Sequence, residues 1–192
     1  MSQIKSIDQL YNTLRLEGVT RVDELEKAFE LIADALLNNY GIRRGDKTYR
    51  FVEIEFYHNL TDDVGKNITY KRGYAESCDF FFHNYGVDLC FESTPESYGG
   101  ILIRSVECNG EFINGPVKVT DVLFDKFSSI REPKGFPMLL PLPHSRPGKI
   151  VPVRSSRWIK SSDKKYRYSW PQEMWNPDPK KYAATPWSPG SI

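Results

Sequence analysis

The chain has 192 residues, which suffices for one domain with a full hydrophobic core, and its 40% hydrophobic and 27% charged content is typical of a soluble globular protein. Three cysteines without paired spacing argue against a disulfide framework or a zinc knuckle, and three histidines argue against a His-rich metal site, so we expect no metal and no cofactor. No apolar run has the length of a membrane span and Met1–Lys5 leads into no apolar leader, so we expect a cytoplasmic protein without a membrane partner.

The net charge of +1 conceals an uneven distribution. Residues 1–125 hold 13 Lys+Arg and 21 Asp+Glu, whereas residues 126–192 hold 13 Lys+Arg, 4 Asp+Glu and all four tryptophans. Basic residues interleaved with aromatic ones suit a polyanion with stackable bases. Packing of this basic segment on the acidic part of its own fold explains the pattern equally well, so both interpretations stay open.

The N-terminal region predicts two helices. In SIDQLYNTL, Ser6 and Gln9 form a capping-box pattern that favours a short helix. The following segment, TRVDELEKAFELIADALLNNYG, predicts a longer helix, because its apolar residues recur at helical spacing. Asn39 with Gly41 is expected to end it.

After Gly45 the hydrophobic period changes to two, which predicts strands in TYRFVEIEFYH, DFFFHNYGVDLCFES and GGILIRSVEC. A further helix is expected in NGPVKVTDVLFDKFSS, with Pro116 at its first position. The fold class predicted is mixed α+β: a single domain, mainly an antiparallel curved sheet or open barrel, with N-terminal helices and one further helix packed on it. Its parts are N-terminal helices in 1–40, the core sheet and helix in 46–127, a Pro-rich connector in 128–150, closing strands in 151–170 and a tail in 171–192.

In the FVEIEFYH strand, alternation places Glu53, Glu55 and Tyr57 on one face and the apolar residues on the other. A solvent-facing polar side is the ordinary explanation, and a carboxylate positioned to polarise water, with Tyr57 beside it, is the functional one. Arg104 shares an apolar face in GGILIRSVE. A buried ion pair with a glutamate and a phosphate or substrate contact both account for it.

The stretch DFFFHNYGVDLCFES carries large apolar groups on both strand faces, which is typical of a central strand covered on both sides. The dipeptide Tyr85-Gly86 is not explained by this, because a bulky ring precedes a residue suited to a bend. We therefore expect the phenylalanines to form mostly a core strand and Tyr85 to project outward.

In order, the chain contains the segments AFELIADALLNNYGIRR, FVEIEFYH, FFFHNYGVDLCFES, GGILIRSVE, NGPVKVTDVLF and KYRYSW. This ordered set resembles the alkyladenine (3-methyladenine) DNA glycosylases of the mammalian type, from about Ala28 to Trp170, as a remote relative with shorter loops. Such an enzyme extrudes a damaged or alkylated purine from the duplex and hydrolyses its N-glycosidic bond in base excision repair.

The resemblance implies roles residue by residue. It assigns water activation to Glu55, base stacking to Tyr57 and Phe82, the duplex wedge to Tyr85, and nucleic-acid contact to Arg104. A pocket-wall position falls on Glu92, where the family has Asn. If the closing strands belong to the same sheet, further basic residues are expected on a nucleic-acid face, namely Arg157, Lys160 and Arg167.

The resemblance implies duplex DNA with a damaged base as partner, and we expect a monomer. A non-catalytic module that binds nucleic acid or a nucleobase-like ligand on the same fold is the alternative, favoured by Glu92 and the short loops. The E-x-E of Glu53–Glu55 also occurs in some ADP-ribosyltransferases, but the upstream S-x-S strand of those enzymes has no counterpart before residue 53.

Overall fold

The computed structural model describes residues 4–62, 67–124, 136–145, 148–153 and 166–175. The helices in this part of the chain are α1 (Ile7–Leu14), α2 (Val22–Asn39) and α3 (Pro116–Phe124). The strands are β1 (Tyr40–Arg44), β2 (Lys47–His58), β3 (Phe80–His83), β4 (Gly86–Cys90), β5 (Gly99–Cys108), β6 (Glu111–Asn114), β7 (Met138–Pro141), β8 (Val151–Val153) and β9 (Arg167–Ser169). Short 3-10 turns follow β2 and β9, at Asn59–Thr61 and Gln172–Met174.

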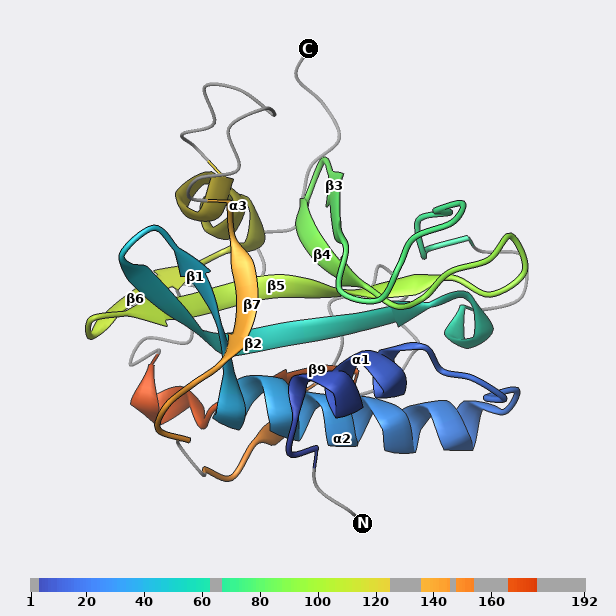
Figure 1. Ribbon diagram of the computed structural model, residues 1–192, viewed down its shortest axis with the longest axis horizontal. Coiled ribbons are helices and arrows are strands. Elements are labelled where there is room, and N and C mark those ends of the chain that lie inside the picture. The colour runs from blue at the N-terminus through green and yellow to red at the C-terminus, as the bar shows by residue number, and fades with distance from the viewer. Residues whose placement is uncertain (1–3, 63–66, 125–135, 146–147, 154–165, 176–192) are drawn as a thin grey trace.

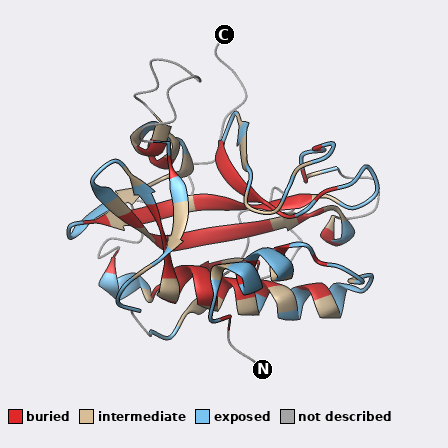
Figure 2. Cartoon of the chain, viewed as in Figure 1, coloured by how far each residue is buried: buried red, intermediate tan, exposed pale blue. Residues whose placement is uncertain are grey.

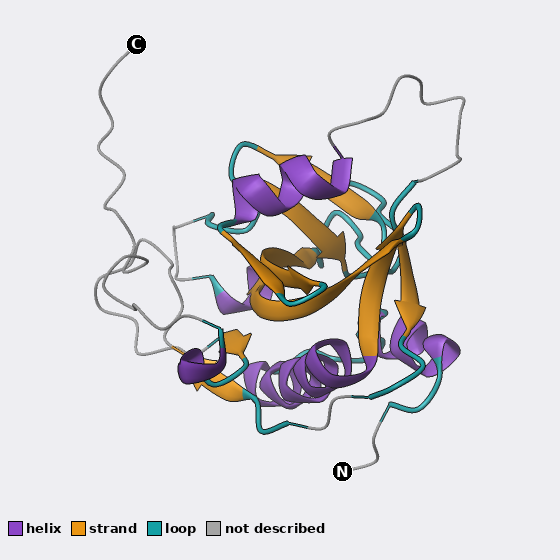
Figure 3. Cartoon of the chain, turned by 90° about the vertical axis from the view of Figure 1, so that its left-hand side faces the viewer, coloured by secondary structure: helices purple, strands orange, loops and turns teal. Residues whose placement is uncertain are grey.

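The strands form one curled antiparallel sheet with the order β3-β4-β5-β2-β1-β7. In addition, β6 pairs with β5, β9 pairs with β2, and β8 pairs with β9. The long strands β2 and β5 cross the middle of the molecule, with α1 and α2 on one side and α3 on the other (Figure 1; the side view in Figure 3). The prediction of a mixed α+β domain built on a curved antiparallel sheet is therefore confirmed.

The apolar core lies between α2 and the sheet. The Phe29 ring of α2 stacks on Phe56 of β2, with ring centroids 4.5 Å apart, and on Phe91, just after β4, at 5.8 Å. Most of β2 and β5 is buried (Figure 2). This packing determines which face of β2 is apolar, and hence which face carries its charged residues.

The described parts of the predicted closing strands, β8 and β9, belong to the same sheet, and residues 154–165 lie outside the described residues. Residues 167–169 of β9 pair with Glu53–Glu55 of β2, and β8 adds to the other edge of β9. Trp170, the next residue, is buried and donates its indole N–H to the carbonyl of Leu37 in α2, at 3.1 Å. The C-terminal strands therefore hold α2 against the sheet.

The prediction of one central strand in residues 79–93 is wrong. The chain instead turns at Asn84 and Tyr85, so that β3 and β4 form a hairpin with His83 paired to Gly86. Of the two hairpin strands, β4 is buried along its whole length, whereas β3 lies at the edge of the sheet and its Phe82 is exposed. Apolar groups occur on both faces of β3 because one face packs on α3 and the other on the loop before the hairpin.

Helix α2 ends at Asn39 as expected, but the glycine that follows does not cap it. The chain passes directly into β1, and Gly41 pairs with Arg50 of β2 in an extended conformation. A Cβ at Gly41 would lie 2.8 Å from the carbonyl oxygen of Tyr49. The glycine therefore permits close approach of two strands and does not supply a left-handed helix end.

Candidate functional site: a carboxylate and guanidinium cluster on the sheet

Glu53, Glu55 and Tyr57 lie on the face of β2 that points away from α2. The opposite face of the strand is apolar and contacts the helix, as the stacking of Phe56 on Phe29 demonstrates. The side of the sheet that carries Glu53, Glu55 and Tyr57 is called the polar face below. Helix α3 lies on this side of the sheet (Figure 1).

Two arginines meet the two glutamates there. Arg104 Nη1 donates to Glu55 Oε2 at 2.8 Å, and Arg104 Nε lies 3.4 Å from Glu53 Oε2. Arg167 Nε lies 3.3 Å from Glu53 Oε1. These four side chains are called the Glu–Arg cluster; their formal charges cancel. Glu55 is completely buried, and Arg104 is mostly buried.

Paired irregularities in the strands assemble the cluster. Along β2 and β5 the register shifts on both sides of Glu53, which leaves Val52 and Arg104 without a register partner. Such bulges redirect a side chain within a sheet, and here Arg104 reaches both glutamates. Arg167 arrives from the opposite side, because β9 pairs it directly with Glu55. The cluster therefore depends on the closing strand as well as on the central pair.

The pKa of Arg104 reflects this arrangement. Burial by itself lowers the pKa of a guanidinium, because it penalises the charged form. The negative charges of Glu55 and Glu53 outweigh that effect, with a smaller contribution from Tyr57, and raise the pKa above its ordinary value. Arg104 is therefore a permanent cation within the sheet. Of the two sequence-based interpretations of Arg104, the buried ion pair is the one observed.

A second charged group lies further along the polar face. Asp88 of β4 and Glu55 of β2 both pair in register with Leu102 of β5, so their side chains point to the same side of the sheet. Asp88 Oδ2 accepts from Arg72 Nη2 at 2.9 Å, and its Oδ1 lies 3.0 Å from His83 Nε2. All three side chains are almost fully buried.

Arg72, Asp88 and His83 were not among the predicted site residues. One sequence signal was available, because an Asp at the centre of the apolar strand GVDLC is unusual for a buried position. Its partner Arg72 lies in an irregular segment 16 residues earlier, where no periodicity indicates a contact.

The predicted stacking residues lie apart. Tyr57 is half-buried and follows Glu55 on the polar face. Phe82 is 51% exposed and packs edge-on against Phe124 of α3, with ring centroids 4.7 Å apart. The residue of β3 that pairs with Asp88, and so shares its face, is Phe81. The structure therefore does not bring Phe82 to Glu55. Tyr85 lies at the hairpin turn and is 45% exposed, in agreement with the outward projection expected for it.

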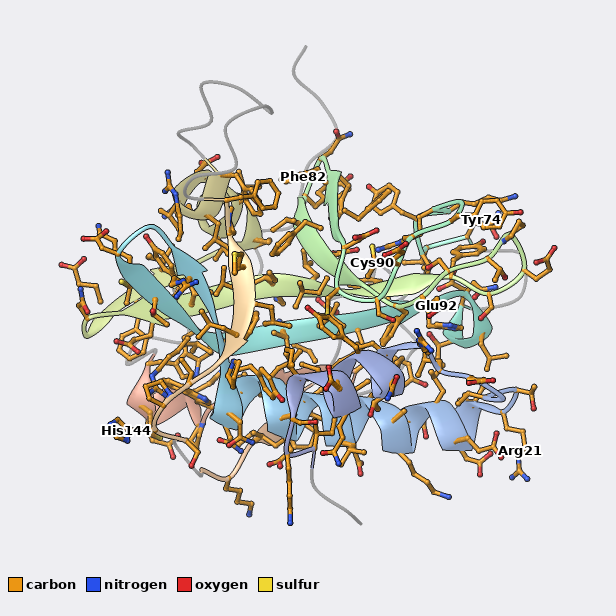
Figure 4. The ribbon with its side chains drawn as sticks, in the orientation of Figure 1. Arg21, Tyr74, Phe82, Cys90, Glu92 and His144 are labelled. Atoms are coloured by element: carbon orange, nitrogen blue, oxygen red, sulfur yellow. The ribbon has the colours of Figure 1, made fainter. Side chains whose placement is uncertain are left out.

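Glu92 is not part of the Glu–Arg cluster. Its carboxylate lies 3.1 Å from Arg15 Nε, and its backbone N–H donates to the carbonyl of Leu14 at the end of α1. In Figure 4 it lies beyond the end of β4 that is remote from Phe82. The structure places Glu92 in an exposed ion pair with the N-terminal region. The remaining predicted contacts, Arg157 and Lys160, lie outside the described residues.

The charge of the described part is negative, with 14 Lys+Arg against 20 Asp+Glu in residues 4–62, 67–124, 136–145, 148–153 and 166–175. Arg72, Arg104 and Arg167, the arginines of the two charged groups, all lie against carboxylates. Within the same ranges no cluster of three or more His, Cys, Asp or Glu side chains has the arrangement of a metal site. No helix in the described part is both long and apolar enough to span a membrane.

Comparison with known proteins finds a viral relative. No family model matches the chain, and no solved structure matches it. The chain is 32% identical over 128 residues to the mimivirus protein called "Uncharacterized protein L759" of Acanthamoeba polyphaga mimivirus. The match covers 53% of this chain and 59% of the viral protein, so the chain spans less than two thirds of its relative's length.

Proposed function

We propose that the protein is a DNA glycosylase-type hydrolase that cleaves the N-glycosidic bond of an extruded, damaged purine, with Glu55 as the water-activating carboxylate. The observation that carries the proposal is the contact of Glu55 with Arg104, at 2.8 Å. These are the two charged positions that the family resemblance marks for chemistry and nucleic-acid contact. They lie 49 residues apart in sequence and meet on one face of the sheet.

The chemistry needs a carboxylate in a fixed place. Cleavage of an N-glycosidic bond passes through an oxocarbenium-like sugar, so a carboxylate can stabilise the positive charge and also orient the attacking water. Arg104 holds Oε2 of Glu55, and the neighbouring strand β9 holds the backbone of Glu55. Tyr57, two residues on and half-buried on the same face, would stack on the base or hydrogen-bond to it. Base release of this kind requires no cofactor.

A second candidate is a non-catalytic module that binds a nucleobase-like ligand. Two observations favour it. Glu55 is 0% exposed and engaged with Arg104, and the described part of the chain is acidic overall. Duplex DNA is bound chiefly through cationic contacts to phosphates, whereas a small aromatic ligand needs none.

Base release and binding separate the two candidates. Duplex oligonucleotides that carry hypoxanthine, ethenoadenine or 3-methyladenine are incubated with the protein, and free base is measured by chromatography. The hydrolase releases base from at least one duplex. The binding module releases none but binds the free base or nucleoside, with an affinity that changes little between low and high salt. Duplex binding that weakens steeply with salt would support the hydrolase.

A further inference from the structure

Three buried polar side chains form a chain of contacts that ends at the hairpin turn. Arg72 Nη2 donates to Asp88 Oδ2 at 2.9 Å, and Asp88 Oδ1 contacts His83 Nε2 at 3.0 Å. The other ring nitrogen of the histidine, Nδ1, accepts a hydrogen bond from the backbone N–H of Tyr85 at 3.2 Å. The contacts therefore run from a buried arginine to the backbone of the residue whose ring projects from the turn.

These partners determine the tautomer of His83. Nδ1 accepts from an amide N–H, so it carries no proton, and Nε2 must then carry the proton and donate it to Asp88. The ring is also stacked on Tyr70, with centroids 4.8 Å apart. Both nitrogens and one face of the imidazole are thereby occupied, and the ring has a single orientation.

The turn itself needs such support. Two-residue hairpin loops favour turns that place one or both central residues at positive φ. Neither Asn84 nor Tyr85 has positive φ, while Gly86, the first residue of β4, does, at +147°. The hydrogen bond from the Tyr85 N–H to a side chain two residues earlier is the pattern by which Asn and Asp stabilise turns. His83 fills that role here.

The arginine at the far end of the chain of contacts is held just as firmly. Its guanidinium lies over the ring of Phe81, 4.4 Å from the centroid, and its Nε donates to the carbonyl of Tyr70 at 3.3 Å. A Cβ at Gly100 of β5 would overlap the Arg72 guanidinium, so a larger residue at this position would force the arginine to move. Asp88 is thus oriented from one side by a fixed cation and orients His83 on the other.

We propose that His83 is a positioning residue that fixes the Tyr85 turn, with Asp88 and Arg72 holding its imidazole in the Nε2–H tautomer. The role of His83 in fixing the turn does not depend on whether the protein is an enzyme. Its consequence for catalysis rests on the proposed function, in which Tyr85 is the wedge that fills the gap left by an extruded base. A wedge must be rigid to do so, and the hydrogen bond from its own backbone supplies that rigidity.

The first test requires no substitution. Long-range ¹H–¹⁵N correlation spectra of the wild-type protein report the protonation of each ring nitrogen of His83. We expect a protonated Nε2 and an unprotonated, hydrogen-bonded Nδ1. A protonated Nδ1 with an unprotonated Nε2 would overturn the proposal, because Nδ1 could not then accept from Tyr85.

The second test compares two substitutions at the same position. Asparagine in His83→Asn can accept from the amide two residues on, whereas phenylalanine in His83→Phe keeps a ring on Tyr70 but offers no acceptor. Amide hydrogen exchange of Tyr85 should accelerate about five- to tenfold in His83→Phe, as expected for loss of one net hydrogen bond, and change less than about twofold in His83→Asn. The amide of Cys90, which donates to the Asp79 carbonyl at 2.8 Å, serves as the internal control for general opening of the hairpin. Equal acceleration in both variants, or none in His83→Phe, would contradict the inference.

Base release from the same variants tests the consequence for catalysis. We expect a lower single-turnover rate in His83→Phe and a rate close to wild type in His83→Asn. Full activity of His83→Phe would refute the link between the turn and catalysis. If wild type releases no base at all, the proposed function fails, and the exchange and tautomer measurements still decide whether His83 fixes the turn.

Discussion

Removal of Arg104 should destabilise the protein far more than neutralisation of Glu55. Arg104→Met leaves a completely buried Glu55 without its 2.8 Å partner and gives the Glu–Arg cluster a net charge of −1. Breaking a buried ion pair from one side typically costs about 3–5 kcal/mol. Glu55→Gln leaves Arg104 still 3.4 Å from Glu53 and keeps an acceptor for its N–H, so we expect about 1–3 kcal/mol.

The free energy of unfolding is measured by urea titration followed by tryptophan fluorescence, for both single variants and the double variant. At this chain length a cost of about 4 kcal/mol corresponds to a fall in Tm of roughly 8–16 °C. The double variant should cost less than the sum of the single ones, since the formal charges of the Glu–Arg cluster cancel again in the double variant. Lys118→Met, an exposed substitution on α3, is the matched control. A cost of Arg104→Met no greater than that of Glu55→Gln would refute the role of Arg104 as the essential partner of the buried Glu55.

Two further predictions concern the packing beside the second charged group. Gly100→Ala should displace Arg72 and lower the free energy of unfolding by about 2–3 kcal/mol. Gly73→Ala is the control, because an added Cβ there meets nothing within 4 Å, and it should change the free energy of unfolding by less than about 0.5 kcal/mol. Equal effects of the two substitutions in urea titrations would show that Gly100 is not needed to accommodate Arg72. Burial, with smaller contributions from Asp79 and Cys90, raises the pKa of the Cys78 thiol to about 12. At pH 8 iodoacetamide should therefore label Cys78 much more slowly in the folded than in the unfolded protein. The contribution of this thiol to the free energy of unfolding should be complete below pH 9. It should decline between pH 9 and about 12, because the thiol of the unfolded chain loses its proton first. Equally fast labelling of both states would show that the thiol is not buried.

Strand alternation predicted correctly that Glu53 and Glu55 share a face of β2, since Arg104 contacts both of them. The interpretation of that face as solvent-facing is wrong, because both glutamates are buried. The ion pair of Arg104 was one of two interpretations that the sequence allowed. The choice between them depended on two bulges and on β9, which is distant in sequence, and none of these leaves a local signal.

The hairpin at Asn84–Tyr85 was missed for a physical reason. A run of three phenylalanines reads as a strand buried on both faces, yet the phenylalanine rings contact α3 and the loop before the hairpin. Neither turn residue adopts positive φ, and the side chain of His83 replaces the usual turn chemistry. Gly86 indicates a bend, but nothing local identifies Asn84 and Tyr85 as the central residues of a hairpin turn.

The most direct test of the proposed function is single-turnover base release by wild type, Glu55→Gln and Glu30→Gln, on the duplex oligonucleotide that wild type cleaves best. Glu30 is exposed on α2, on the opposite side of the sheet from the polar face, and is the matched Glu→Gln control. We predict a loss of about 100- to 10,000-fold in Glu55→Gln and an unchanged rate in Glu30→Gln. Base release at the wild-type rate by folded Glu55→Gln would contradict the assignment of Glu55 as the water-activating carboxylate.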